Sequence, residues 1–161
     1  MSGENHGYTG SGAVRVLFLE MDNSGRSQMA QGLLQRFGGK RYEVYSAGAF
    51  PTELAPEAVE VMREVGVDIS MQRAKSSREY LGQHFDHVFQ ICDQSAEACP
   101  VFPGAGTRTC WPVPDPAAGS RSEGDTLARY REARDRVWEL MRETFGDEPA
   151  DEYSRTQPVG K

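Results

Sequence analysis

Residues 14–34 read VRVLFLEMDNSGRSQMAQGLL, and this stretch decides the fold. Ala13–Leu19 is a short apolar and β-branched run, which is typical of a buried parallel strand. A turn-rich loop, Glu20–Gly25, follows this run. From Arg26–Phe37 the apolar residues share one helical face: Met29, Leu33, Leu34 and Phe37. Strand, loop and helix in this order predict a parallel α/β fold, in which ligands bind at the loops that follow the strands.

The rest of the chain continues this alternation. Tyr42–Ser46 is expected to be a strand, Pro56–Val65 a helix and His87–Cys92 a third strand. Cys110–Pro112 is expected to close a fourth strand, and Ser122–Phe145 has the pattern of a long amphipathic helix. The alternation predicts a three-layer α/β domain with a four-stranded parallel sheet flanked by helices.

Composition excludes several classes of protein. The chain has 161 residues, with 18 Lys and Arg against 24 Asp and Glu, and its net charge is −6. We expect no nucleic-acid partner, because phosphate backbones are bound by basic patches. We expect no membrane association, since no apolar run approaches the ~20 residues of a membrane helix. A polar N-terminus and three sparse cysteines favour a reducing, cytoplasmic location.

The chain is expected to divide into three segments. Residues 1–12 are glycine-rich and aperiodic, which predicts a disordered leader, and residues 147–161 are expected to be a mobile tail. Residues 13–146 have neither an internal repeat nor a low-complexity linker. They are expected to form one continuous domain.

The loop Glu20–Gly25 is the first candidate site. Its backbone amides, together with the N-terminus of the following helix, are positioned to form an anion-binding nest. Arg26 would add a bidentate fork for an oxyanion. A plain connecting loop is the alternative, because strand–loop–helix turns are common.

Several sequence blocks resemble one known family. The blocks are VLFLEMDNSGRSQMAQGLL (residues 16–34), YSAG (45–48), EVMREVGVDIS (60–70), CDQSAEACPVFPG (92–104) and WPVPDPAA (111–118). They resemble the thioredoxin-coupled arsenate reductases, which share their fold with the low-molecular-weight protein tyrosine phosphatases. The resemblance covers roughly residues 14–145 and implies the phosphatase-like fold with flavodoxin-like winding. It also implies that a Cys-x5-Arg-Ser phosphate loop is matched here by Asn23, Ser24, Arg26 and Ser27.

The chain departs from the family pattern at the phosphate loop. Glu20, six residues before Arg26, occupies the position of the family's nucleophilic cysteine, and residues 21, 22 and 25 also differ. A carboxylate forms neither a thiophosphate nor an arsenic–sulfur bond. Beside a bound oxyanion at about 4 Å it would cost on the order of 4 kcal/mol at an effective dielectric of ~20. We therefore expect weak binding of phosphate and arsenate.

Three roles for Glu20 stay open. It plugs the nest, it orients or deprotonates a neutral or cationic substrate, or it helps to bind a cation. A nest of amides suits a base or an electrostatic role better than an acid role. The residues expected to contact a substrate are Met21, Asp22, Asn23, Ser24, Gly25 and Ser27.

The resemblance singles out three further residues. Asp115 matches the family's functional aspartate and would form an acid/base pair with Glu20; the alternative is a turn aspartate before Pro116. Cys92 and Cys99 match the relay cysteines that pass the oxidation to thioredoxin. Without a thiol at position 20 this relay lacks its first member, so inherited, inert thiols are the alternative, although the two can still pair with each other. Cys110 is expected to be a packing residue.

No metal or other cofactor is expected. The chain lacks the Cys-x2-Cys and His-x3-His spacings of metal sites. Some family reductases hold potassium beside the loop, but Gln31 and Lys75 stand where those members have carboxylates. An ammonium there would substitute for the ion.

These observations lead to one functional expectation and two alternatives. We expect a divergent, arsenate-reductase-like protein without the catalytic cysteine, which acts on a small organic molecule through Glu20, Arg26 and Asp115. Isomerase, lyase, cyclase or hydrolase chemistry would suit these groups. The first alternative is a non-catalytic protein that binds a ligand or a protein partner, and the second is a residual arsenate reductase or phosphatase. Thioredoxin is not expected as a partner.

Overall fold

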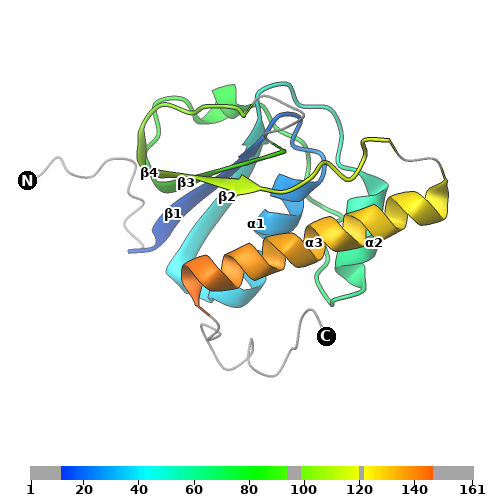
Figure 1. The fold of residues 1–161 in the computed structure, drawn as a ribbon. Helices are drawn as coiled ribbons and strands as arrows, with labels where there is room; N and C mark the ends of the chain where they lie inside the picture. The colour runs from blue at the N-terminus through cyan, green and yellow to red at the C-terminus, as the bar shows by residue number, and fades with distance from the viewer. Residues whose placement is uncertain (1–11, 94–98, 120–121, 147–161) are drawn as a thin grey trace, which may run out of the picture.

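A computed structural model describes residues 12–93, 99–119 and 122–146. The predicted leader, except for its last residue, and the predicted tail lie outside the described residues. Four parallel strands form one sheet in the order β2-β1-β3-β4: β1 (Val14–Glu20), β2 (Tyr42–Gly48), β3 (Phe85–Cys92) and β4 (Ala105–Pro112) (Figure 1). This order is that of a flavodoxin-like sheet. The prediction of a four-stranded parallel sheet in a three-layer α/β domain is confirmed.

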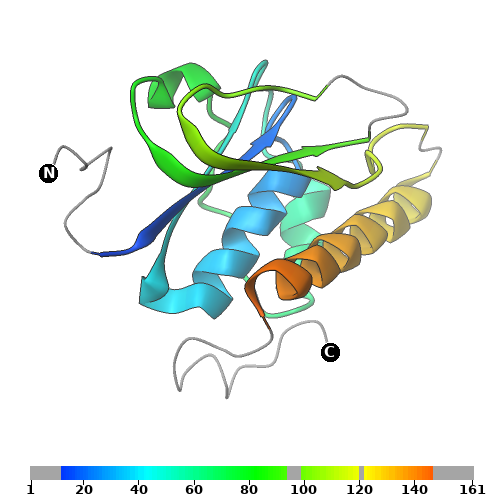
Figure 2. The ribbon, with the colours of Figure 1, turned by 60° about the vertical axis from the view of Figure 1, so that its left-hand side comes forward.

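The α-helices of the described residues cover one face of the sheet, as Figure 2 shows. They are α1 (Arg26–Gly38), α2 (Pro56–Arg63) and α3 (Glu123–Phe145). Apolar residues of all three helices pack with Phe18, Phe89 and Trp111 of the sheet in one buried cluster. Removing this apolar surface from water is the main driving force for the α/β packing.

A thinner layer covers the opposite face. Leu17 and Leu19 of β1 pack there with Phe85 and with Phe102, which follows the third strand. Tyr80 belongs to the 3-10 helix η2 (Ser77–Tyr80) and packs against this second cluster. A second 3-10 helix, η1 (Gly39–Arg41), connects α1 to β2. Because β1 has neighbours on both faces and both edges, its sequence is an almost continuous apolar run.

Local sequence signals set the ends of the helices. Pro56 stands in the first turn of α2, where its missing N–H costs nothing. The Ser122 hydroxyl accepts a hydrogen bond from the Asp125 amide at 3.0 Å and caps the start of α3. Among the described residues, no helix combines the length and the apolar character needed to cross a membrane.

Candidate active site

The loop between β1 and α1 lies at the carboxyl edge of the sheet, where parallel α/β folds bind ligands. Gly48, at the end of β2, pairs with Glu20 in the register of the two strands. A Cβ added at Gly48 would lie 2.8 Å from the Asn23 amide nitrogen, so only glycine admits the loop at this distance. Asn23 itself has a φ of 53°, in the left-handed region that asparagine tolerates. Together these two residues fold the loop back over the sheet edge.

Glu20 fills the centre of this loop and is only 2% exposed. Its Oε1 accepts hydrogen bonds from the Ser27 amide at 3.0 Å, the Ser27 hydroxyl at 2.7 Å and the Gly25 amide at 3.4 Å. Its Oε2 accepts from the Arg26 amide at 3.3 Å and from Arg26 Nε at 2.9 Å. The carboxylate therefore occupies the donors that an oxyanion would use in such a nest.

Arg26 connects the loop to Val113, the residue after β4, and through Val113 to the end of β3. It is 2% exposed and forms a buried ion pair with Glu20. Its Nη1 donates to the Val113 carbonyl at 2.7 Å, and the Val113 amide donates to the Cys92 carbonyl at 3.2 Å. One residue of the chain thus lies between the guanidinium and the backbone of Cys92.

Asn23 and Lys75 brace the loop from the β2 side. The Asn23 side-chain amide donates to the hydroxyls of Ser27 and Ser46, and its carbonyl oxygen accepts from the Lys75 backbone amide at 2.8 Å. The Lys75 ammonium lies 3.4 Å from the Ser46 hydroxyl, which itself donates to Gln31. Burial, helped by the charge of Arg73, lowers the pKa of Lys75 to about 8. The Lys75 side chain therefore lies beside Ser46, which connects it to Gln31.

The remaining loop residues face each other or the neighbouring segment. Asp22 Oδ1 accepts from the Ser24 amide and hydroxyl, in a local turn. The Met21, Asp22 and Ser24 carbonyls accept hydrogen bonds from the amides of residues 50, 52 and 55. A Cβ at Gly25 would lie 3.1 Å from the Tyr130 ring, so the ring of α3 closes the loop from the helix side.

Asp115 lies apart from Glu20. It is half-buried, and its Oδ1 accepts from the Ala117 amide at 3.0 Å, as in the turn reading of this residue. Within the described residues, no hydrogen bond or ion pair joins Asp115 to Glu20. Burial first, and then the negative charges of Glu57, Asp115 and Glu20, raise the pKa of the Tyr130 hydroxyl. The acid/base pair expected from the sequence is thus not assembled by direct contact.

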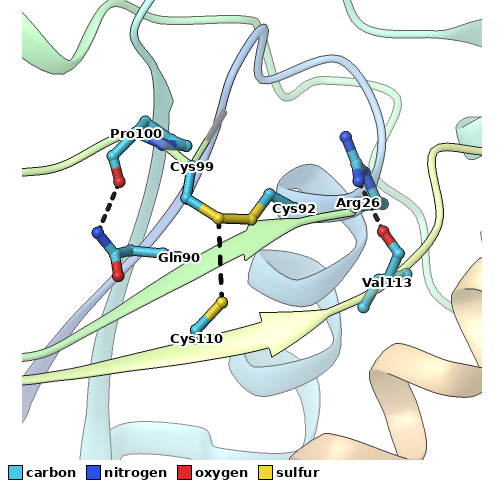
Figure 3. Close-up of a disulfide and its surroundings, with 7 residues drawn as sticks. All are labelled: Arg26, Gln90, Cys92, Cys99, Pro100, Cys110 and Val113. Carbon is cyan, nitrogen blue, oxygen red and sulfur yellow. Dashed lines mark hydrogen bonds between the residues drawn. A yellow bond between two sulfur atoms is a disulfide. The ribbon is translucent and has the colours of Figure 1, made fainter. Parts of the chain in front are cut away.

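The cysteines gather at the end of the third strand (Figure 3). Cys92 and Cys99 form a disulfide with a Cα–Cα distance of 5.6 Å. Cys110, which the sequence suggested for packing, has its Sγ 4.0 Å from that of Cys99. Sequence reasoning missed this contact because it depends on the pairing of Cys110 with Gln90 across β3 and β4.

The disulfide and the loop carboxylate lie on opposite faces of the sheet. Along β3, Phe89 and Ile91 belong to the cluster under the helices, so Gln90 and Cys92 point to the other face. In β1, Phe18 belongs to the helix-side cluster and Leu19 to the opposite one, which places Glu20 on the helix side. A cysteine thiol at this site and an anion bound in the loop Glu20–Gly25 would therefore lie on opposite faces of the sheet.

Comparisons with known proteins agree on one family. The family model described as low molecular weight phosphotyrosine protein phosphatase matches residues 15–151. An arsenate reductase of Halalkalibacterium halodurans is 35% identical over 132 residues, which are 82% of this chain and 94% of that protein. An arsenate reductase of Bacillus subtilis is 35% identical over 128 residues, or 80% of this chain and 92% of that protein.

Solved structures give the same relationship. A structure described as an arsenate reductase in the phosphate binding state has a TM-score of 0.68 and 27% identity, covering 81% of this chain and 95% of that chain. The thioredoxin-dependent arsenate reductase of Corynebacterium glutamicum has a TM-score of 0.59 and 29% identity. That match covers 85% of this chain and 64% of the other.

These findings overturn two expectations. The expectation of a repurposed acid/base enzyme, with a pseudo-enzyme as its alternative, is wrong, because the relatives at 35% identity over most of the chain are arsenate reductases. The expectation that thioredoxin is an unlikely partner is also wrong, because a solved relative is a thioredoxin-dependent arsenate reductase. Cys92 and Cys99 form a two-electron couple in the structure.

Proposed function

The chain belongs to the low-molecular-weight phosphotyrosine protein phosphatase family, and we propose that it reduces arsenate with electrons from the Cys92–Cys99 thiol pair. The observation that carries this proposal is the Cys92–Cys99 disulfide at the carboxyl edge of the sheet. Two thiols that close into a disulfide supply the two electrons needed to convert arsenic(V) into arsenic(III). Arsenate is the proposed substrate because relatives at 35% identity are arsenate reductases.

The proposed reaction balances in two steps. In the first, a thiolate of the reduced pair displaces an oxygen of arsenate, which leaves as water after protonation, and a sulfur–arsenic(V) bond forms. In the second, the other thiol attacks that sulfur, the sulfur–arsenic bond breaks, and its electron pair stays on arsenic. The products are one arsenite, one water and the Cys92–Cys99 disulfide.

We further propose that Glu20 occupies the position of the family's nucleophilic cysteine. Two observations support this assignment: Glu20 ends β1 six residues before Arg26, and its carboxylate accepts hydrogen bonds from the amides of Gly25, Arg26 and Ser27. The nucleophile for arsenate is then a thiol of the pair rather than a loop residue. Arg26, through the Val113 carbonyl, is the cation that links the loop to Cys92.

A thioredoxin-type dithiol protein would regenerate the pair. Cys92 is fully buried, whereas Cys99 is partly exposed. An external thiolate would therefore attack the Cys99 sulfur, and the Cys92 thiolate would leave. We also propose a cytoplasmic location, because thioredoxin keeps dithiols reduced there.

The test is a coupled assay with arsenate, thioredoxin, thioredoxin reductase and NADPH, in which NADPH oxidation and arsenite are both measured. We expect arsenite and NADP+ in equal amounts. Cys92→Ser and Cys99→Ser should each abolish turnover, and Cys110→Ser should retain it. Absence of arsenite above the protein-free blank, or turnover that survives in both variants, would refute the proposal.

A further inference from the structure

The cluster of Cys92, Cys99 and Cys110 contains one more thiol than the proposed reduction needs. The three Sγ atoms all lie within 4.8 Å of one another, and the pair Cys99–Cys110 is separated by 4.0 Å. Sulfurs that bind one centre at about 2.3 Å stand roughly 3.8 Å apart in tetrahedral geometry. The Cys99–Cys110 separation is close to this value, and the Cys92 and Cys99 sulfurs, which are bonded to each other in the disulfide, would move apart to it on reduction.

We propose that Cys92, Cys99 and Cys110, once reduced, form a three-thiolate binding site for trivalent arsenic. Soft thiolates select soft ions, which favours arsenic(III) over hard cations such as Mg2+ or Ca2+. Among the described residues, the cluster contains no fourth His, Cys, Asp or Glu ligand. A set of three sulfurs suits three-coordinate, pyramidal arsenic(III) better than four-coordinate Zn2+. The choice of arsenic rests on the proposed function, of which arsenite is the product.

The fold holds the three thiols at fixed positions. Cys110 pairs with Gln90 across the parallel strands, so Cys110 and Cys92 project from the same face of the sheet. The Gln90 side-chain amide donates to the Pro100 carbonyl at 2.7 Å and thereby fixes the residue that follows Cys99 (Figure 3). After the disulfide has been reduced, the β3–β4 pairing and the Gln90–Pro100 hydrogen bond still keep the three sulfurs close to one another.

Binding is a ligand exchange and needs no further oxidant or reductant after the disulfide has been opened. Arsenous acid and three thiols give one arsenic trithiolate and three waters. Opening the disulfide takes two electrons from a phosphine or from a protein dithiol. The oxidised chain offers only one thiol of the cluster and is not expected to bind.

The experiment is a titration of the reduced full-length chain with arsenite. A phosphine reductant is used, because dithiothreitol would bind arsenite itself. Ultraviolet sulfur–arsenic absorbance gives the affinity, and native mass spectrometry gives the stoichiometry as a gain of one arsenic less three hydrogens. We expect one arsenite per chain. Cys110→Ser should weaken binding at least about tenfold, or about 1.4 kcal/mol.

Two controls separate this proposal from the reductase proposal. Arg108 lies on the same strand and the same face as Cys110, and Arg108→Ala should leave the arsenite affinity unchanged. Arsenate turnover of the parent chain is measured in parallel, since the proposed reduction uses only Cys92 and Cys99. Arsenite binding that is equally tight in Cys110→Ser would overturn the third-ligand role even if turnover is normal. So would a mass gain of one arsenic and one oxygen less one hydrogen, which is that of arsenic bound by two thiolates and one hydroxyl. If the parent chain binds arsenite but does not turn over arsenate, the reductase proposal alone is refuted.

Discussion

Replacing Glu20 by alanine should destabilise the protein and create a response to oxyanions. The carboxylate and the Arg26 guanidinium are each 2% exposed and lie 2.9 Å apart. Removing one partner of a buried ion pair leaves an uncompensated charge and costs about 3–5 kcal/mol. In a domain of this size that loss lowers Tm by roughly 10 °C.

Phosphate, arsenate or sulfate should restore much of this loss in Glu20→Ala. The variant exposes the amides of Gly25, Arg26 and Ser27, and it leaves Arg26 without its carboxylate. An anion that binds only the folded state stabilises it by about 2.7 kcal/mol at 100 times its Kd. In the parent chain Glu20 already accepts from these donors, so the same anions should have a much smaller effect.

The assay is urea unfolding of both proteins with and without phosphate at constant ionic strength. Glu43→Ala is the matched control, because it breaks the 2.9 Å pair between Glu43 and Arg15 (4% exposed) at a distance from the loop. The control should lose stability but gain nothing from phosphate. Equal phosphate effects on the parent and on Glu20→Ala would refute the view that the carboxylate fills an anion nest.

Two further predictions concern the residues around the loop. Burial lowers the pKa of Lys75 from 10.5 to about 8, so between these pH values the unfolded chain holds a proton that the folded chain has lost. The unfolding free energy of the parent should therefore rise with pH relative to that of Lys75→Met across this window, by on the order of 2 kcal/mol after partial screening. A pH-independent difference between the two proteins would contradict this assignment. Gly48→Ala should cost about 1–3 kcal/mol in urea unfolding, because its Cβ would meet loop backbone at 2.8 Å, whereas Gly124→Ala meets nothing within 4 Å and should be neutral or stabilising. Similar losses in the two glycine variants would count against the close approach.

The sequence predicts the first half of the fold well, because its signals there are local. The run that predicts β1 and the helical spacing that predicts α1 agree with the structure to within one residue at each end. For β4 only the end was expected. Its first residues, AGTRT, have no alternation of apolar and polar side chains, and pairing with β3 alone makes them a strand.

The same distinction between local sequence signals and strand pairing holds for the candidate site. Glu20 and Arg26 could be chosen from the sequence because both stand in one short loop, and the structure brings them into contact. The cluster formed by Cys110 with the Cys92–Cys99 pair needs the register of two strands, which spacing along the chain does not give.

The most direct test of the central claim is a single turnover without any recycling protein. Fully reduced chain, freed of excess reductant, is mixed with arsenate, and arsenite and disulfides are quantified together by speciation and peptide mass spectrometry. We expect one arsenite per chain and one new Cys92–Cys99 disulfide, with no arsenite from Cys99→Ser. Unchanged arsenate with all three thiols still reduced would contradict the proposed reduction.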